Sequence, residues 1–117
     1  NFENKFLKEN YSILSKSGNP AALMVDMSHG NSQKQFKKQL LVNKDVADQI
    51  SSGEESIFGV MIESHLIEGN QSIGPKEDLT YGQSITDACV SWEVTEIMLN
   101  LLASAVKSRR KNIEKSA

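Results

Sequence analysis

Two short apolar runs are the feature that most limits what this chain can fold into. They occupy residues 21–25 (AALMV) and 56–62 (SIFGVMI). Each has the length and composition of a strand that is buried in a parallel sheet. Gly59, inside the second run, predicts close approach of another backbone segment rather than a turn. Each run is followed by an ionisable side chain, His29 after the first and Glu63 after the second.

Helix-like stretches flank and separate these runs. Residues 2–16 carry apolar side chains at steps of three and four, and residues 17–20 (SGNP) end that helix. A second helix, or a pair of helices divided at Asn43, is predicted from about Gln33 to Gly53. A long polar loop follows over residues 65–82. The capping-box-like SITD that begins at Ser84 then predicts a long helix to about Arg110.

The predicted order of elements is helix, strand, helix, strand, helix. This alternation predicts an α/β fold with parallel strands joined by right-handed crossovers. Two parallel strands cannot close a sheet, and each leaves an edge of unpaired backbone groups. We therefore expect residues 1–117 to form a single segment, two βα units of a larger sheet or barrel, and not a complete domain. The chain also begins without an initiator methionine, which fits the same expectation.

Composition excludes several classes of function. The 117 residues carry a formal net charge of -2, so there is no electrostatic basis for binding nucleic acid. The basic stretches QKQFKKQ and KSRRKNIEK are better explained as solvated helix faces than as phosphate-binding patches. A single cysteine, Cys89, excludes an internal disulfide and agrees with a reducing cytoplasm. No run of 18 apolar residues is present, so no membrane span is expected.

The ends of the two predicted strands hold the residues with the most chemistry. Parallel strands place all their carboxyl ends on one face, where α/β proteins build their sites. His29 and Glu63 therefore point to a shared site, and Asp87, at the start of the last predicted helix, faces the same side. One imidazole and two carboxylates suit a divalent cation of the Mn, Fe, Co or Zn kind. Spacing alone favours the alternative, in which these are an ordinary loop histidine, a salt-bridged strand end and a helix N-terminal charge.

Four longer motifs carry a family resemblance. MVDMSHGNSQKQFKKQ, GVMIESHLIEGNQS, LTYGQSITDACVSWE and LLASAVKSRR resemble the C-terminal part of the metal-dependent type I 3-deoxy-D-arabino-heptulosonate 7-phosphate (DAHP) synthases. The resemblance covers nearly the whole chain but only about the last third of a typical member. It implies a (β/α)8 TIM barrel, of which this chain supplies the last two strands and their helices.

The resemblance also implies a reaction and a ligand set. Phosphoenolpyruvate condenses with erythrose 4-phosphate in the first step of the shikimate pathway. The metal ligands of the family fall on His29 in SHGNS, Glu63 in MIESH and Asp87 in SITDA. The fourth ligand is a cysteine on the first barrel strand, which Cys89 does not match. The residues that bind the substrate phosphates belong to earlier strands as well.

Further expectations concern the residues around His29, the partners and the isolated chain. Asp26 and Asn31 are candidates to orient His29. The expected partners are the two substrates, the N-terminal remainder of the barrel and further copies of the protein, in the cytoplasm. The isolated chain is expected to be inactive. The alternative function is a catalytically inactive remnant that serves as an assembly or interaction module through its open strand edges.

Overall fold

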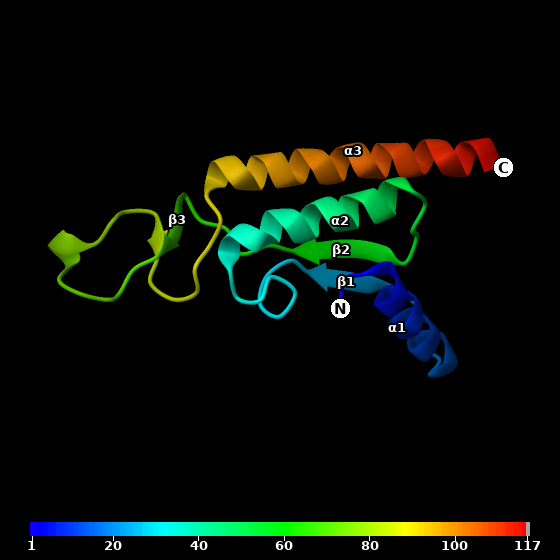
Figure 1. Cartoon of the computed structure of the whole chain (residues 1–117), viewed down its shortest axis with the longest axis horizontal. Helices are drawn as coiled ribbons and strands as arrows, with labels where there is room; N and C mark the ends of the chain where they lie inside the picture. The colour runs from blue at the N-terminus through cyan, green and yellow to red at the C-terminus, as the bar shows by residue number, and fades with distance from the viewer. Residues whose placement is uncertain (117) are drawn as a thin grey trace.

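A computed structural model describes residues 1–116, in which two helices cover one face of a parallel sheet (Figure 1). A further helix precedes the sheet, and an irregular arm with two short strands lies before the last helix. The elements are α1 (Asn4–Lys16), β1 (Leu23–Asp26), the 3-10 helix η1 (Phe36–Lys38), α2 (Gln39–Ser51), β2 (Ile57–Met61), β3 (Ile67–Asn70), the 3-10 helix η2 (Lys76–Asp78), β4 (Gln83–Ser84) and α3 (Trp92–Ser116).

The two apolar runs form the parallel strands β1 and β2, as predicted. Val25 pairs with Val60 and Asp26 with Met61, and the backbone N–H of Met27 extends the ladder to the carbonyl of Met61 at 2.9 Å. Both strands point toward the end of the sheet at which α2 and α3 begin (Figure 1). The carboxyl ends of the strands and the amino ends of the two helices therefore lie together at one end of the sheet.

The core lies between the sheet and the helices α2 and α3. Val25 and Ile57 contribute to it from the sheet, and Leu7 contributes from α1. The helices add the remaining large apolar side chains, among them Val42, Val46, Ile50, Met98 and Leu102. This packing fixes the two helices on the sheet, and so it fixes the loops that join strand to helix.

The opposite face of the sheet is open. Met24 of β1 is 58% exposed and Phe58 of β2 is 65% exposed, although both are large and apolar. Among residues 1–116, no third strand pairs with β1 or β2. An uncovered apolar face with two free edges is a liability for a separate protein.

The second predicted helix differs from the observed one. Residues 31–34 form turns, with Gln33 and Lys34 at positive φ, so the helix does not begin at Gln33. Of the two alternatives at Asn43, the structure has the single helix, because α2 is continuous through this residue. Asn43 is fully buried and donates a hydrogen bond from Nδ2 to the carbonyl of Met98 in α3, at 3.3 Å. A buried contact between helices, rather than a break, explains this polar residue.

The last helix begins later than predicted. Residues 84–87 end β4 and form a bend, and α3 starts at Trp92. Ser91 provides the N-cap, because its Oγ accepts a hydrogen bond from the backbone N–H of Val94 at 3.2 Å. The stretch predicted as a loop over residues 65–82 contains β3, which pairs with β4. None of the helices formed by the described residues is long and apolar enough to cross a membrane.

The cap at Ser91 can be tested directly. We expect Ser91→Ala to lower the free energy of unfolding by about 1 kcal/mol, because the N–H of Val94 loses its acceptor. Ser91→Asp keeps an acceptor in place and should retain most of the stability. Denaturant unfolding of the three proteins measures the difference. Equal losses in both variants would contradict the cap.

A candidate metal centre at the ends of the strands

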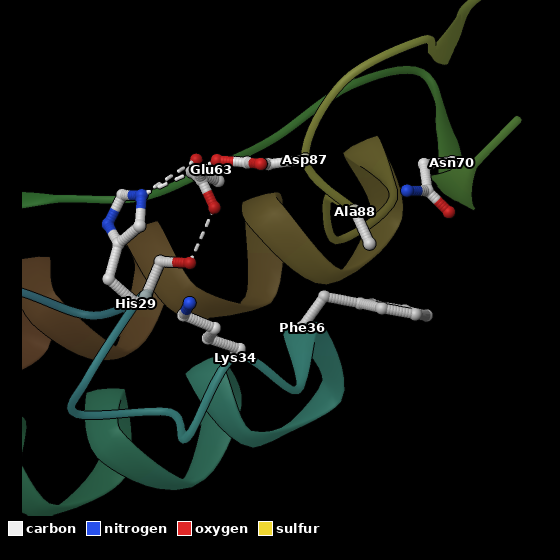
Figure 2. A pocket seen from close by; sticks show the side chains of 8 residues that line it. His29, Lys34, Phe36, Glu63, Asn70, Asp87 and Ala88 are labelled. Atoms are coloured by element: carbon white, nitrogen blue, oxygen red, sulfur yellow. Dashed lines mark hydrogen bonds and ion pairs between the residues drawn. The ribbon is translucent and has the colours of Figure 1, made fainter. Parts of the chain in front are cut away.

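Three side chains with ligand atoms meet at the carboxyl end of the sheet. His29 follows β1, Glu63 follows β2 and Asp87 comes from the loop before α3. The Nε2 atom of His29 lies 3.3 Å from Oε1 of Glu63 and 3.5 Å from Oδ2 of Asp87. One ligand atom from each residue lies within 4.8 Å of the other two. Figure 2 shows the three side chains turned toward one another.

These distances fit a shared cation. Nitrogen and oxygen ligands held about 2.1 Å from one ion, at angles of about 90 to 110°, lie about 3.0 to 3.4 Å apart. The two measured distances from Nε2 are close to that range. A neutral imidazole nitrogen also repels carboxylate oxygens at this separation, so a proton or a metal ion must lie between them. The donor set of one nitrogen and two carboxylates suits a borderline divalent metal.

Asp26 holds His29 from the other side of the ring. Its Oδ2 lies 2.9 Å from Nδ1 of His29, and its Oδ1 accepts the backbone N–H of Ser28 at 2.8 Å. A carboxylate on Nδ1 keeps a proton there and leaves the lone pair of Nε2 directed at Glu63 and Asp87. Asp26 is thus placed to orient the imidazole.

Asn31 acts on the turn rather than on the ring. Its Nδ2 donates to the backbone carbonyl of Asp26 at 2.8 Å. His29 itself has φ of 46°, in the left-handed region that residues other than glycine rarely adopt. The backbone N–H of Lys34 donates to the carbonyl of His29 at 2.8 Å and helps to hold this conformation. A strained backbone kept by specific hydrogen bonds is typical of functional sites.

Glu63 is held by two residues that sequence analysis did not select. The Oγ of Ser28 donates to Oε2 of Glu63 at 2.6 Å, and the side chain of Gln39 bonds to the backbone of Glu63. Ser28 and Gln39 are both buried. Ser28 had one signal in the sequence, its place next to His29. Gln39 had none, because a glutamine near the start of a helix is usually solvated.

Asp87 reaches the site from a loop and not from a helix. The prediction that it begins the last helix is wrong, since α3 starts five residues later, at Trp92. The loop is nevertheless tied to the site, because the backbone N–H of Val90 donates to the carbonyl of Glu63 at 3.0 Å. Cys89 exchanges two backbone hydrogen bonds with Gly69 and has a buried side chain, as predicted for a core residue. Its thiol is not part of the cluster of ligand atoms found among the described residues.

A pocket of about 320 Å³ opens beside the three residues. Lys34 lines it with a cationic side chain and Asn70 with an amide (Figure 2). Sequence analysis did not select Lys34, because a lysine in a polar stretch is usually solvated. The remaining lining residues are Ser28, His29, Phe36, Glu63, Asp87 and Ala88.

The charges around His29 favour its protonated form. The hydrogen bond to Asp26 raises the pKa of His29 above 6.5, and the negative charges of Glu63 and Asp26 raise it further. The folded chain thus holds this proton more tightly than an unfolded chain does. The stabilisation is fully present below pH 6.5 and disappears as the pH rises through the raised pKa. A divalent metal competes with the same proton for the same lone pair.

We predict that the imidazole of His29 in the metal-free protein titrates above 6.5. Asp26→Asn should lower this pKa, because it removes the largest cause of the shift. Asp48→Asn removes the same charge from an exposed position near the far end of α2 and should leave the pKa unchanged. Nitrogen chemical shifts of the ring, followed by NMR against pH, measure all three values. A pKa in the Asp26→Asn protein equal to that of the unaltered chain would contradict the role of Asp26.

Comparison with known proteins shows the family. A family model described as the DAHP synthetase I family matches residues 6–100. The Phe-sensitive phospho-2-dehydro-3-deoxyheptonate aldolase of Escherichia coli (strain K12) is 56% identical over 110 residues, which are 94% of this chain and 31% of that protein. The phenylalanine-inhibited phospho-2-dehydro-3-deoxyheptonate aldolase of Saccharomyces cerevisiae is 46% identical, over 98% of this chain and 33% of that protein.

A solved structure agrees with these sequence matches. It is that of phospho-2-dehydro-3-deoxyheptonate aldolase from Francisella tularensis SCHU S4, with a TM-score of 0.88 and 48% identity. The match covers 93% of this chain and 31% of that one. The chain therefore spans about a third of the length of the relatives it matches. Because the family model and the relatives match over most of its residues, the chain belongs to the DAHP synthetase I family.

Proposed function

We propose that the chain is the C-terminal segment of a metal-dependent DAHP synthase. The complete enzyme condenses phosphoenolpyruvate with erythrose 4-phosphate in the first step of the shikimate pathway. His29, Glu63 and Asp87 supply three ligands of its divalent metal. The observation that carries this proposal is the convergence of the three side chains from separate segments, with Asp26 behind His29.

We further propose that the segment supplies the last two βα units of a (β/α)8 barrel. The parallel pairing of β1 with β2, and the placement of α2 and α3 on one face, support this. The exposed Met24 and Phe58 then face the barrel interior, and the free edges of the sheet pair with strands of the N-terminal remainder. On this proposal residues 1–117 are a single segment and not a complete domain.

The donor set fits a metal of the Mn, Fe, Co or Zn kind. When bound, it supplies Lewis acidity for the aldehyde carbonyl of erythrose 4-phosphate. The fourth ligand that the resemblance implies is a cysteine of the first barrel strand. Cys89 does not take that place, because its buried side chain lies outside the cluster.

The residues of this chain orient the ligands and shape the substrate pocket. Asp26 keeps a proton on Nδ1 of His29, so that Nε2 is free to bind. Ser28 holds one carboxylate oxygen of Glu63 and leaves the other facing His29. Lys34 gives the adjoining pocket a positive charge, which suits substrates that carry phosphate and carboxylate groups.

The alternative function, an inactive interaction module, is not favoured. An interaction module has no need of Asp26 on His29, or of Ser28 on Glu63. The matched relatives are also named as aldolases. As part of the proposal, we expect the complete enzyme to be a cytoplasmic homo-oligomer, which its native mass and cell fractionation would test.

Replacing His29 tests the metal proposal in the complete enzyme. We expect His29→Ala to weaken Mn²⁺ binding by more than the roughly 100-fold that loss of an outer partner causes, and to abolish synthesis of the seven-carbon product. His65→Ala is the matched control, because His65 is exposed and, among the described residues, its Nδ1 accepts only the neighbouring N–H of Leu66. Calorimetric titration with Mn²⁺ and a product assay measure both effects. Equal binding by the two variants would sink the proposal.

The isolated chain gives a second test. We expect no synthesis by residues 1–117 alone, because the implied fourth ligand and the implied phosphate-binding residues lie outside them. Adding the N-terminal two-thirds of the enzyme as a separate chain should restore activity, since strand edges would pair and close the barrel. A product assay on each mixture checks this. Measurable product from the isolated chain would contradict the proposal.

A further inference from the structure

We propose that Gln39 is a positioning residue that fixes the backbone of Glu63 and thereby sets the metal affinity of the site. The inference deepens the function proposed above and rests on it. Gln39 supplies no ligand atom to the cluster and does not line the pocket, so it acts only through Glu63.

The contact is a two-point clamp between a side chain and a peptide backbone. Gln39 is the first residue of α2 and its side chain is fully buried, with 0% exposed. Its Nε2 donates to the carbonyl of Glu63 at 3.1 Å, and its Oε1 accepts the backbone N–H of Glu63 at 3.0 Å. A primary amide presents a donor and an acceptor side by side, as a neighbouring strand does. Gln39 therefore makes with Glu63 the two backbone hydrogen bonds that a neighbouring strand would otherwise make.

Glu63 needs such a partner because the ladder between β1 and β2 ends before it. β2 stops at Met61, and the last ladder hydrogen bond on that side is accepted by the carbonyl of Met61. The carbonyl of Glu63 also accepts the N–H of Val90, at 3.0 Å. The backbone of Glu63 thus makes three hydrogen bonds, two of them to Gln39. Without Gln39, the N–H of Glu63 has no acceptor among the described residues.

Ser28 and Gln39 divide the placement of Glu63 between them. Ser28 fixes the carboxylate, through the 2.6 Å hydrogen bond to Oε2. Gln39 fixes the backbone from which that side chain extends. Together they leave Oε1 facing Nε2 of His29 at 3.3 Å. Metal ligation tolerates displacements of only about 0.2 Å from ideal distances, so a shift of this backbone should weaken binding directly.

The clamp also links α2 to the loop that carries Asp87. Val90 bonds to the same carbonyl that accepts Nε2 of Gln39, and Val90 lies three residues after Asp87. Loss of Gln39 therefore loosens the carbonyl of Glu63, to which Val90 also bonds. It thus affects two of the three ligands, Glu63 directly and Asp87 through its loop. We therefore expect loss of Gln39 to lower metal affinity by more than its effect on stability alone would explain.

The test compares two substitutions in α2 of the complete enzyme, Gln39→Met and Val46→Ala. Gln39→Met keeps the length of the side chain and removes both hydrogen bonds of the clamp. Val46 lies seven residues further along the same helix, is fully buried in the core and does not line the pocket, so Val46→Ala should destabilise the protein without removing a hydrogen bond of Glu63. The melting temperature of the metal-free protein shows how far the two losses of stability match.

We expect Gln39→Met to weaken Mn²⁺ binding by about 10- to 100-fold, the range typical of outer partners of metal ligands. Val46→Ala should leave the dissociation constant within about twofold of the unaltered enzyme, because Val46 makes no hydrogen bond to a ligand residue and does not line the pocket. The visible absorption of bound Co²⁺ should change in Gln39→Met and not in Val46→Ala, since it reports ligand geometry. Equal metal affinity in Gln39→Met and the unaltered enzyme overturns the inference. So does an equal loss of affinity in Val46→Ala at a matched loss of melting temperature.

Two further variants keep the test decisive. If Gln39→Met fails to fold, Gln39→Glu takes its place. As a carboxylate it retains the acceptor for the N–H of Glu63 and loses the donor to the carbonyl of Glu63. It should still weaken Mn²⁺ binding relative to the unaltered enzyme, by less than the loss of both hydrogen bonds would. Glu63→Ala separates this inference from the proposed function. If the unaltered enzyme and Glu63→Ala bind Mn²⁺ equally, the proposed function itself fails. If only Glu63→Ala is impaired and both Gln39 variants bind normally, the metal site stands and the clamp does not.

Discussion

The parallel pairing of β1 with β2 decides where every residue of the site can be. The register places Asp26 beside Met61, and the ladder ends one residue later at Met27. The two chains leave the sheet at the same end, and His29 and Glu63 follow within three residues of it. A shift of one residue in this register would turn each side chain to the other face of its strand. The core side chains Val25 and Ile57 oppose such a shift, because it would expose them.

The electrostatics of the site follow from this arrangement. Asp26, Glu63 and Asp87 bring three carboxyl groups around one imidazole. These groups repel one another, and only a cation between them makes the geometry favourable. In the metal-free chain these charges raise the pKa of His29 and favour the imidazolium, which places a positive charge between them. The features that hold the proton therefore prepare the site for a divalent ion, which carries twice the charge.

Much of the fold could be predicted from the sequence, because it depends on local patterns. The apolar runs marked both strands, and their alternation with helices predicted the parallel pairing that brings His29 and Glu63 together. The start of α3 could not be predicted in the same way, since SITD at Ser84 resembles a cap while Ser91 is the actual one. Local propensity did not distinguish the two, and the pairing of β4 with β3 decided between them.

The contacts that bring the candidate residues together were harder to predict than the candidates themselves. Asp87 was selected for a position at a helix start that it does not occupy. It reaches His29 because Val90 and Cys89 tie its loop to Glu63 and Gly69. Such contacts join residues distant in the chain, and no periodicity records them. Gln39 was missed for the same reason, because its role depends on one peptide group 24 residues away.

The open face of the sheet connects folding to ligand binding. The ligand residues extend from strands whose outer edges are unpaired among the described residues, and Met24 and Phe58 leave the far side of those strands uncovered. Strands that are free on one side can twist and shift, and the residues at their ends shift with them. Closure of a barrel around β1 and β2 would remove that freedom and hold His29 and Glu63 at a fixed separation. A bound metal would favour the same separation from the other direction. Barrel closure and metal binding should therefore stabilise each other, because both select one position of the strand ends.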